Sequence, residues 1–128
     1  MSEALSETQI NALNRFSAEQ RFDYFINKVI EQQEVWGLCS DQGWVILEDG
    51  GDEHLPIWPH AELAALWVTG EYSDCTPTAI TLDTWLAKWL PGMEKDGLLA
   101  AISPDTEGEG IIVSAEELAE TMSERMAS

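Results

Sequence analysis

The amino-acid sequence predicts a single α+β domain (mixed α/β), with a meander-containing sheet of about five or six strands and helices packed on it. A chain of 128 residues with 45% hydrophobic residues is long enough to bury a core. Apolar residues recur at helical spacing in residues 17–33, and short β-favouring runs between turn residues follow them. No linker divides the chain, and residues 1–5 and 126–128 are expected to fray.

Two helices are expected before residue 34. In the second, over residues 17–33, Phe22, Ile26 and Val29 form an apolar stripe at intervals of three and four residues. Ser17 and the glutamine three residues later match a capping box, which satisfies the free N–H groups at a helix start. A shorter helix precedes this one.

The following segment predicts a β-meander with tight hairpins. Its three strands are expected at Val35–Cys39, Trp44–Leu47 and Leu55–Trp58, separated by Asp-Gln-Gly and Asp-Gly-Gly-Asp. Pro56 cannot donate a ladder hydrogen bond, so the third run is expected to be an edge strand or a strand end.

A helix is expected after the Trp-Pro-His segment. Pro59 suits the first turn, where a missing N–H costs nothing, and Gly70 suits the position just after a helix that ends near Thr69. His60 would then lie in the first turn, where the helix dipole disfavours a positive charge, so we expect a neutral imidazole.

A tryptophan-rich helix follows. Thr81 or Asp83 is expected to cap it, and Trp85 and Trp89 lie one turn apart on its buried face. The Pro-Gly dipeptide at 91–92 is expected to interrupt it.

The rest of the chain supplies strands and a last helix. Strands are expected near 78–80, 98–102 and 111–113. Ser114 with Glu117 forms a capping box that opens a C-terminal helix.

Charge is the most informative feature of the composition. The chain has 24 acidic and 6 basic residues, a net charge of −18, and eleven acids but no Lys or Arg between Lys28 and Lys88. Direct binding of nucleic acid is not expected, because phosphate contacts need clustered cations. The charge could serve only solubility or salt adaptation, or it could attract a basic protein partner.

The sequence also bears on location. No apolar run approaches the ~20 residues of a membrane span, and the first ten residues lack the features of a signal peptide, so a cytoplasmic protein is expected. Cys39 and Cys75 are then expected to be reduced, packed as small apolar residues.

Four residues are candidates for a binding site: Trp36, Trp44, Trp58 and His60. The tryptophans could line an aromatic cleft at a strand-to-helix junction, with His60 as a neutral acceptor or base. No nucleophile motif, phosphate loop or metal-ligand spacing occurs, so we predict no catalytic residue, no cofactor and no metal. The acidic segment 48–54 lacks the spacing of a calcium loop.

The motifs Trp-Gly-Leu at 36–38, Gly-Trp at 43–44 and Trp-Pro-His at 58–60 resemble those of a family of small acidic bacterial domains of unknown function. The likeness covers about residues 17–122. More remotely, the segment 111–118, "IIVSAEEL", resembles the strand–helix ending of SseB-type domains. The resemblance implies an architecture and no mechanism.

The leading hypothesis from the sequence is a non-enzymatic acidic protein-binding or adaptor module, in one version immunity-like against a basic toxin. The alternative is a small-molecule-binding protein or minor enzyme centred on His60 and the strand tryptophans. Oligomeric state and pathway have no signature in the sequence.

Overall fold

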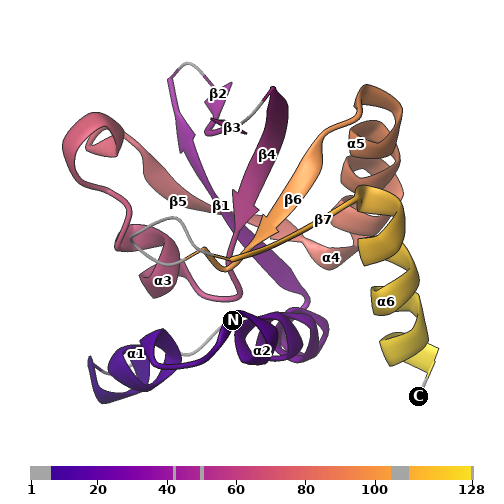
Figure 1. Ribbon diagram of the computed structural model, residues 1–128, viewed down its shortest axis with the longest axis horizontal. Helices are drawn as coiled ribbons and strands as arrows, with labels where there is room; N and C mark the ends of the chain where they lie inside the picture. Colours follow the sequence, from indigo (N-terminus) through magenta and orange to yellow (C-terminus); the bar gives the residue numbers. More distant parts are fainter. Residues whose placement is uncertain (1–6, 42, 50, 105–109, 128) are drawn as a thin grey trace.

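The computed structural model describes residues 7–41, 43–49, 51–104 and 110–127 and confirms the α+β class (Figure 1). The helices are α1 (Glu7–Asn14), α2 (Ala18–Gln32), α3 (Ala61–Ala65), the short 3-10 turn η1 (Gly70–Tyr72), α4 (Leu82–Thr84), the π-helical segment η2 (Trp85–Trp89), α5 (Leu90–Asp96) and α6 (Ala115–Ala127). The strands are β1 (Glu34–Ser40), β2 (Gly43–Trp44), β3 (Leu47–Asp49), β4 (Asp52–Ile57), β5 (Thr76–Thr81), β6 (Leu99–Ile102) and β7 (Ile111–Val113).

The seven strands form two small sheets, where the sequence led us to expect one sheet of five or six strands. One sheet has the order β2-β1-β5 and the other the order β3-β4-β6-β7. The predicted middle strand Trp44–Leu47 is wrong as a single strand, because Trp44 ends β2 and Leu47 begins β3, so the antiparallel hairpins β1–β2 and β3–β4 lie in different sheets. A simple meander does not result, because β1 also pairs with β5 and β4 pairs in parallel with β6, partners distant in the chain.

The third strand is interior in its sheet, although Pro56 predicted an edge strand or a strand end. The register explains how the proline is tolerated. β3 pairs with β4 only as far as His54, and from there to Ile57 the strand is paired in register with β6 alone. Pro56 therefore lies where the ladder has only one partner strand.

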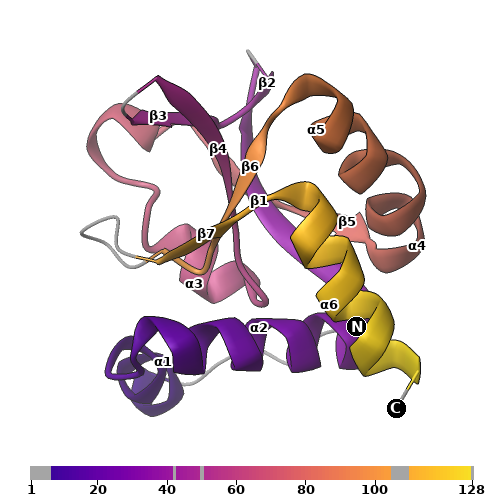
Figure 2. The ribbon, with the colours of Figure 1, turned by 45° about the vertical axis from the view of Figure 1, so that its right-hand side comes forward.

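The main core lies between the strands and the helices α2, α5 and α6. The predicted stripe of α2 enters it through Phe25, Ile26 and Val29, and α6 contributes Leu118 and Met122. Figure 2 shows α2 running beneath the strands and α6 packed at one side. The capping box predicted for α2 is confirmed, since Ser17 and Gln20 form both of its hydrogen bonds, and at α6 the Ser114 hydroxyl accepts from Glu117 N–H, which is one of the two bonds of the predicted box.

A second, smaller cluster lies beside α3. We call it the α3 cluster, and its buried members are Leu13, Leu38, Trp58, Leu63, Ala64 and Cys75. The helix itself is much shorter than predicted, because α3 ends at Ala65 and Gly70 begins the separate turn η1 with a φ of 57°. Pro59 precedes the helix rather than starting it, and His60 is the N-cap residue.

The tryptophan-rich helix begins as predicted, because the Thr81 hydroxyl accepts a hydrogen bond from Thr84 N–H. The expected interruption at Pro91-Gly92 is wrong. The helix continues through both residues to Asp96 and ends at Gly97, whose φ is 72°. The π-helical turn Trp85–Trp89 lies directly before the proline, and such a turn alters the hydrogen-bond ladder that an α-helix would need there.

Candidate functional site

The Trp-Pro-His segment lies where β4 ends and α3 begins, and a backbone bridge ties it to β1. Trp36 N–H donates to Trp58 C=O at 2.9 Å, and Trp58 N–H donates to Trp36 C=O at 2.8 Å. This antiparallel bridge connects the two sheets, whose other pairings are internal to each sheet among the described strands. Two of the predicted site residues are therefore direct neighbours.

The Trp58 side chain has a structural role that accounts for its presence in the Trp-Pro-His segment. Its side chain is 1% exposed, in the α3 cluster, and its Nε1–H donates to Pro104 C=O at 3.1 Å. Trp67 Nε1–H donates to the same carbonyl at 3.3 Å, and the two indole rings lie 5.7 Å apart. A buried tryptophan usually has a partner for this N–H, and Pro104 supplies one to both.

His60 is held by α2. Its side chain is 3% exposed, and Nε2 lies 2.7 Å from the Tyr24 hydroxyl. A second link fixes the backbone at this point, because Gln32 Nε2 donates to Pro59 C=O at 2.9 Å. Two residues of α2 therefore clamp the entry to α3.

The other ring nitrogen of His60 has no such contact. Nδ1 is buried, and the described residues supply it with no hydrogen-bond partner. The direction of the Tyr24–His60 hydrogen bond depends on the tautomer, but Nδ1 stays unsatisfied in both. An unsatisfied buried polar atom costs about 1–3 kcal/mol of stability.

Burial controls the protonation of this pair. It lowers the pKa of His60, an effect that Lys28 reinforces and that Glu62 and Glu31 oppose. It raises the pKa of Tyr24, which Lys28 opposes. The imidazole is thus neutral and the phenol protonated near pH 7, and at His60 the main cause is burial rather than the helix dipole invoked from the sequence.

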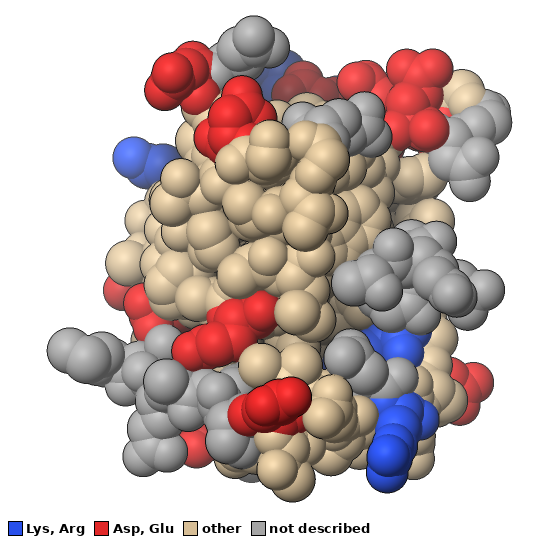
Figure 3. Space-filling model, turned by 90° about the vertical axis from the view of Figure 1, so that its left-hand side faces the viewer, with Lys and Arg blue, Asp and Glu red and all other residues tan. Residues whose placement is uncertain are grey.

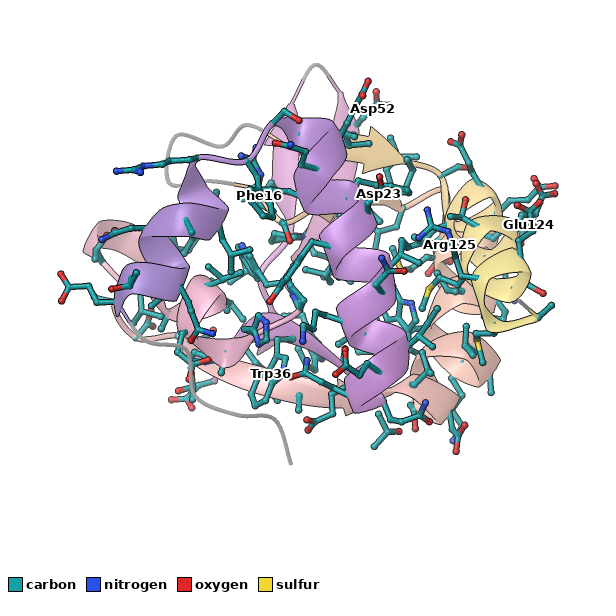
Figure 4. The ribbon with its side chains drawn as sticks, turned by 90° about the horizontal axis from the view of Figure 1, so that it is seen from below. Phe16, Asp23, Trp36, Asp52, Glu124 and Arg125 are labelled. Atoms are coloured by element: carbon teal, nitrogen blue, oxygen red, sulfur yellow. The ribbon has the colours of Figure 1, made fainter. Side chains whose placement is uncertain are left out.

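Trp36 lies on the same strand-to-helix junction. In Figure 4 it is seen beside the C-terminal end of α2. Its Nε1 is buried, without a hydrogen-bond partner in the described part of the chain, so the junction holds a second unsatisfied nitrogen.

Trp44 lies apart from this junction. Its ring packs edge-on against Trp89, with the centroids 4.9 Å apart, and belongs to the main core. A Cβ on Gly37 would lie 3.1 Å from the Trp44 ring. The absence of a side chain at this glycine of the Trp-Gly-Leu motif therefore lets the indole pack closely against β1. The structure thus brings together Trp36, Trp58 and His60, and places Trp44 next to the tryptophan-rich helix.

The described residues contain no group of three or more His, Cys, Asp or Glu arranged to hold a metal ion. Within the acidic segment 48–54, His54 is 6% exposed and points into the protein, whereas Glu48 and Glu53 are exposed. Cys75 is buried, Cys39 half-buried, and both are free thiols; burial raises the pKa of Cys75. Among the described helices, none combines the length and apolarity required to cross a membrane.

Sequence reasoning missed two parts of the site, Tyr24 and Pro104. Tyr24 lies 36 residues before His60, on another helix, and no local pattern identifies it as the partner of the imidazole. Pro104 lies 46 residues after Trp58, and no local pattern identifies its carbonyl as an acceptor.

Comparison with known proteins gives a family and no activity. No curated protein matches the chain. A family described as protein of unknown function (DUF2750) matches residues 22–122, which include the α2 clamp, the Trp-Pro-His segment and most of α6. The chain belongs to this DUF2750 family.

Proposed function

We propose that the protein is a non-enzymatic acidic module that binds a basic protein, in one version as an immunity-like neutraliser of a cationic toxin. The observation that carries the proposal is an acidic end of the molecule, built by the two hairpins and the loop before β5. We define it by five exposed residues: Asp41, Glu48, Asp52, Glu53 and Asp74. Figure 3 shows acidic side chains, with basic ones among them, along the upper edge of one face, the end where Figure 1 places β2 and β3.

Three of the chain's basic residues form their contacts near α2. Lys28 pairs with Glu31, and Arg125 pairs with Asp23 between α6 and α2, as Figure 4 shows. Arg21 donates to Phe16 C=O at the start of α2. Half of the six basic residues are thus engaged near α2, at the opposite end of the fold from the hairpins.

The hairpin register concentrates charge at a cost. Glu48 on β3 lies directly opposite Glu53 on β4. Like charges in this position destabilise an antiparallel pair by about 0.2–1 kcal/mol. A solubility role could be met by acids placed anywhere on the surface, so acids held face to face favour a role that needs local charge density.

The acidic end also carries an apolar residue. Ile46, between β2 and β3, is 45% exposed. An exposed aliphatic side chain among charges is the arrangement of an interface, where an apolar anchor contributes affinity and the surrounding charges contribute rate and selectivity.

The rival function, a small-molecule site at His60, has weaker support. The unsatisfied Nδ1 favours it, because it is a polar atom without a partner in the described structure. However, the ring is 3% exposed, so a ligand could reach it only if α2 or α3 moved. The exposed acidic end requires no such movement.

The test compares two triple variants with the same change of net charge. One neutralises the acidic end (Glu48→Gln, Asp52→Asn, Glu53→Gln), and the other neutralises α6 (Glu116→Gln, Glu117→Gln, Glu120→Gln). Pull-downs from the native lysate are made at low ionic strength with a crosslinker, followed by affinity measurement with the purified partner.

We expect the wild type and the α6 variant to retain one cationic protein, and the acidic-end variant to lose it. Affinity should fall steeply with salt, because screening shortens the range of the attraction. Equal binding by both variants would place the interface elsewhere, and the absence of any captured cationic protein would contradict the proposed function.

A further inference from the structure

A cavity of about 250 Å³ opens beside the tryptophan-rich helix, where its wall residue Trp89 contacts Trp44 of β2. It is lined by Lys88, Trp89, Gly92, Met93, Asp96 and Leu98. This volume is slightly below that of usual ligand sites and suits a fragment-sized group.

Two features of the helix shape this cavity. The π-helical turn Trp85–Trp89 sets the positions of Lys88 and Trp89, and such turns are frequent at functional sites. Gly92, one turn further on, leaves the space open, since a Cβ built there meets nothing within 4 Å. A glycine in a helix costs about 1 kcal/mol relative to alanine, so this position is occupied against helix propensity.

The cavity has an aromatic wall that is held rigidly. Trp89 stacks on Trp85, with the ring planes 27° apart, and Trp44 packs edge-on against its ring. Met93 and Leu98 supply the rest of the apolar lining. Trp89 is therefore fixed in place before any ligand arrives.

Charge at the rim selects the ligand. Lys88 and Asp96 are both exposed, and neither forms an ion pair with another residue in the described ranges. They lie eight residues apart, about 12 Å along a helix, so a small ligand engages one of them. The net charge of −18 concentrates cations and repels anions around the molecule, which favours a cation paired with Asp96. An indole wall is also the preferred aromatic partner of a cation.

We infer that this cavity binds a small cation with an apolar body, either a free alkyl- or arylammonium ion or the Arg or Lys side chain of a protein. The second source rests on the proposed function, since a basic partner would supply such side chains. The first source is independent of it.

The experiment titrates the protein with three probes of similar shape: benzylammonium, benzyl alcohol and phenylacetate. The readout is the Trp89 indole N–H resonance. Benzylammonium is expected to bind most tightly, with a Kd on the order of 1 mM. Asp96→Asn should weaken it about two- to fivefold, and Lys88→Gln should strengthen it.

Gly92→Leu is the decisive variant, because Gly92 lines the cavity and a Cβ built there meets nothing within 4 Å, so the larger side chain is expected to occupy the space. It should abolish binding of benzylammonium, whereas Ala87→Leu, an exposed position of the same helix outside the cavity lining, should not. Equal binding of phenylacetate, no binding of benzylammonium, or full binding by Gly92→Leu would overturn the inference.

A fourth probe, acetylarginine methylamide, separates the two sources. Tighter binding than benzylammonium, lost in Gly92→Leu, indicates a protein side chain, and weaker binding indicates a free amine. If Gly92→Leu still captures the basic protein while losing benzylammonium, the cavity takes a free amine and the acidic-end proposal stands unaffected. If the wild type binds benzylammonium but captures no basic protein, the proposed function fails while the cavity site remains.

Discussion

Stability below neutral pH should depend on His60. Burial lowers its pKa below the ordinary value of 6.5, so the folded state binds fewer protons than the unfolded state as the pH falls. The contribution to stability is therefore fully present above pH 6.5 and is lost as the pH falls below it, toward the depressed folded pKa. The limiting slope is about 1.4 kcal/mol per pH unit, so between about pH 7.5 and 5.5 the loss reaches at most about 1.4 kcal/mol.

Urea denaturation across this pH range measures the effect. The wild type should lose stability as calculated, and His60→Gln, whose side chain does not titrate, should show a flatter profile with a lower stability at pH 7.5. The imidazole C–H resonance in the folded wild type should titrate with a midpoint below 6.5. Parallel pH profiles for the two proteins, or a folded midpoint above 6.5, would refute a buried neutral histidine.

Three further substitutions test the fold. Gly110→Ala should destabilise the protein by about 1–3 kcal/mol, because the new Cβ would lie 2.7 Å from Ile102 C=O; thermal unfolding measures it, and an unchanged Tm would contradict the close approach. Glu53→Lys should stabilise it by about 0.5–1 kcal/mol at low salt, since it replaces the repulsion with Glu48 by attraction, and a gain that persists in 1 M salt would argue against an electrostatic cause. Ser17→Ala should cost about 1 kcal/mol in urea denaturation through loss of the capping box, and no loss would mean that water caps the helix equally well.

The sequence predicted the elements whose signals are local. α2 and α6 each have an apolar stripe and an N-terminal capping residue within one short segment. The spacing of the apolar residues and the position of the cap therefore predict the same helix start. The failure at Pro91 has a local cause of another kind. Nothing in the amino-acid composition indicates a π-helical turn. In an ordinary α-helix a proline at this position would break the helix, which is why the sequence predicted an interruption.

Sheet topology and the site depended on distant partners. The split into two sheets follows from β1 pairing with β5 and β4 with β6, and no hairpin turn specifies either choice. The same holds for the candidate site. His60 was identified as unusual from its own segment, but Tyr24 and the unsatisfied Nδ1 became visible only when α2 was placed against α3. Trp44 was grouped with the wrong tryptophans because alternation along strands does not say which helix covers each face.

The position of the acids makes the binding proposal separable from stability. The buried core lies between the strands and α2, α5 and α6, whereas the side chains of Glu48 and Glu53 are exposed on the β3–β4 hairpin. Most substitutions that abolish binding are ambiguous, since they also weaken the fold. Here neutralising the facing pair relieves a repulsion, so the variant should be at least as stable as the wild type. A protein that becomes more stable and yet loses its partner can have lost only the interaction, and that combination of results would assign the charge of this end to binding.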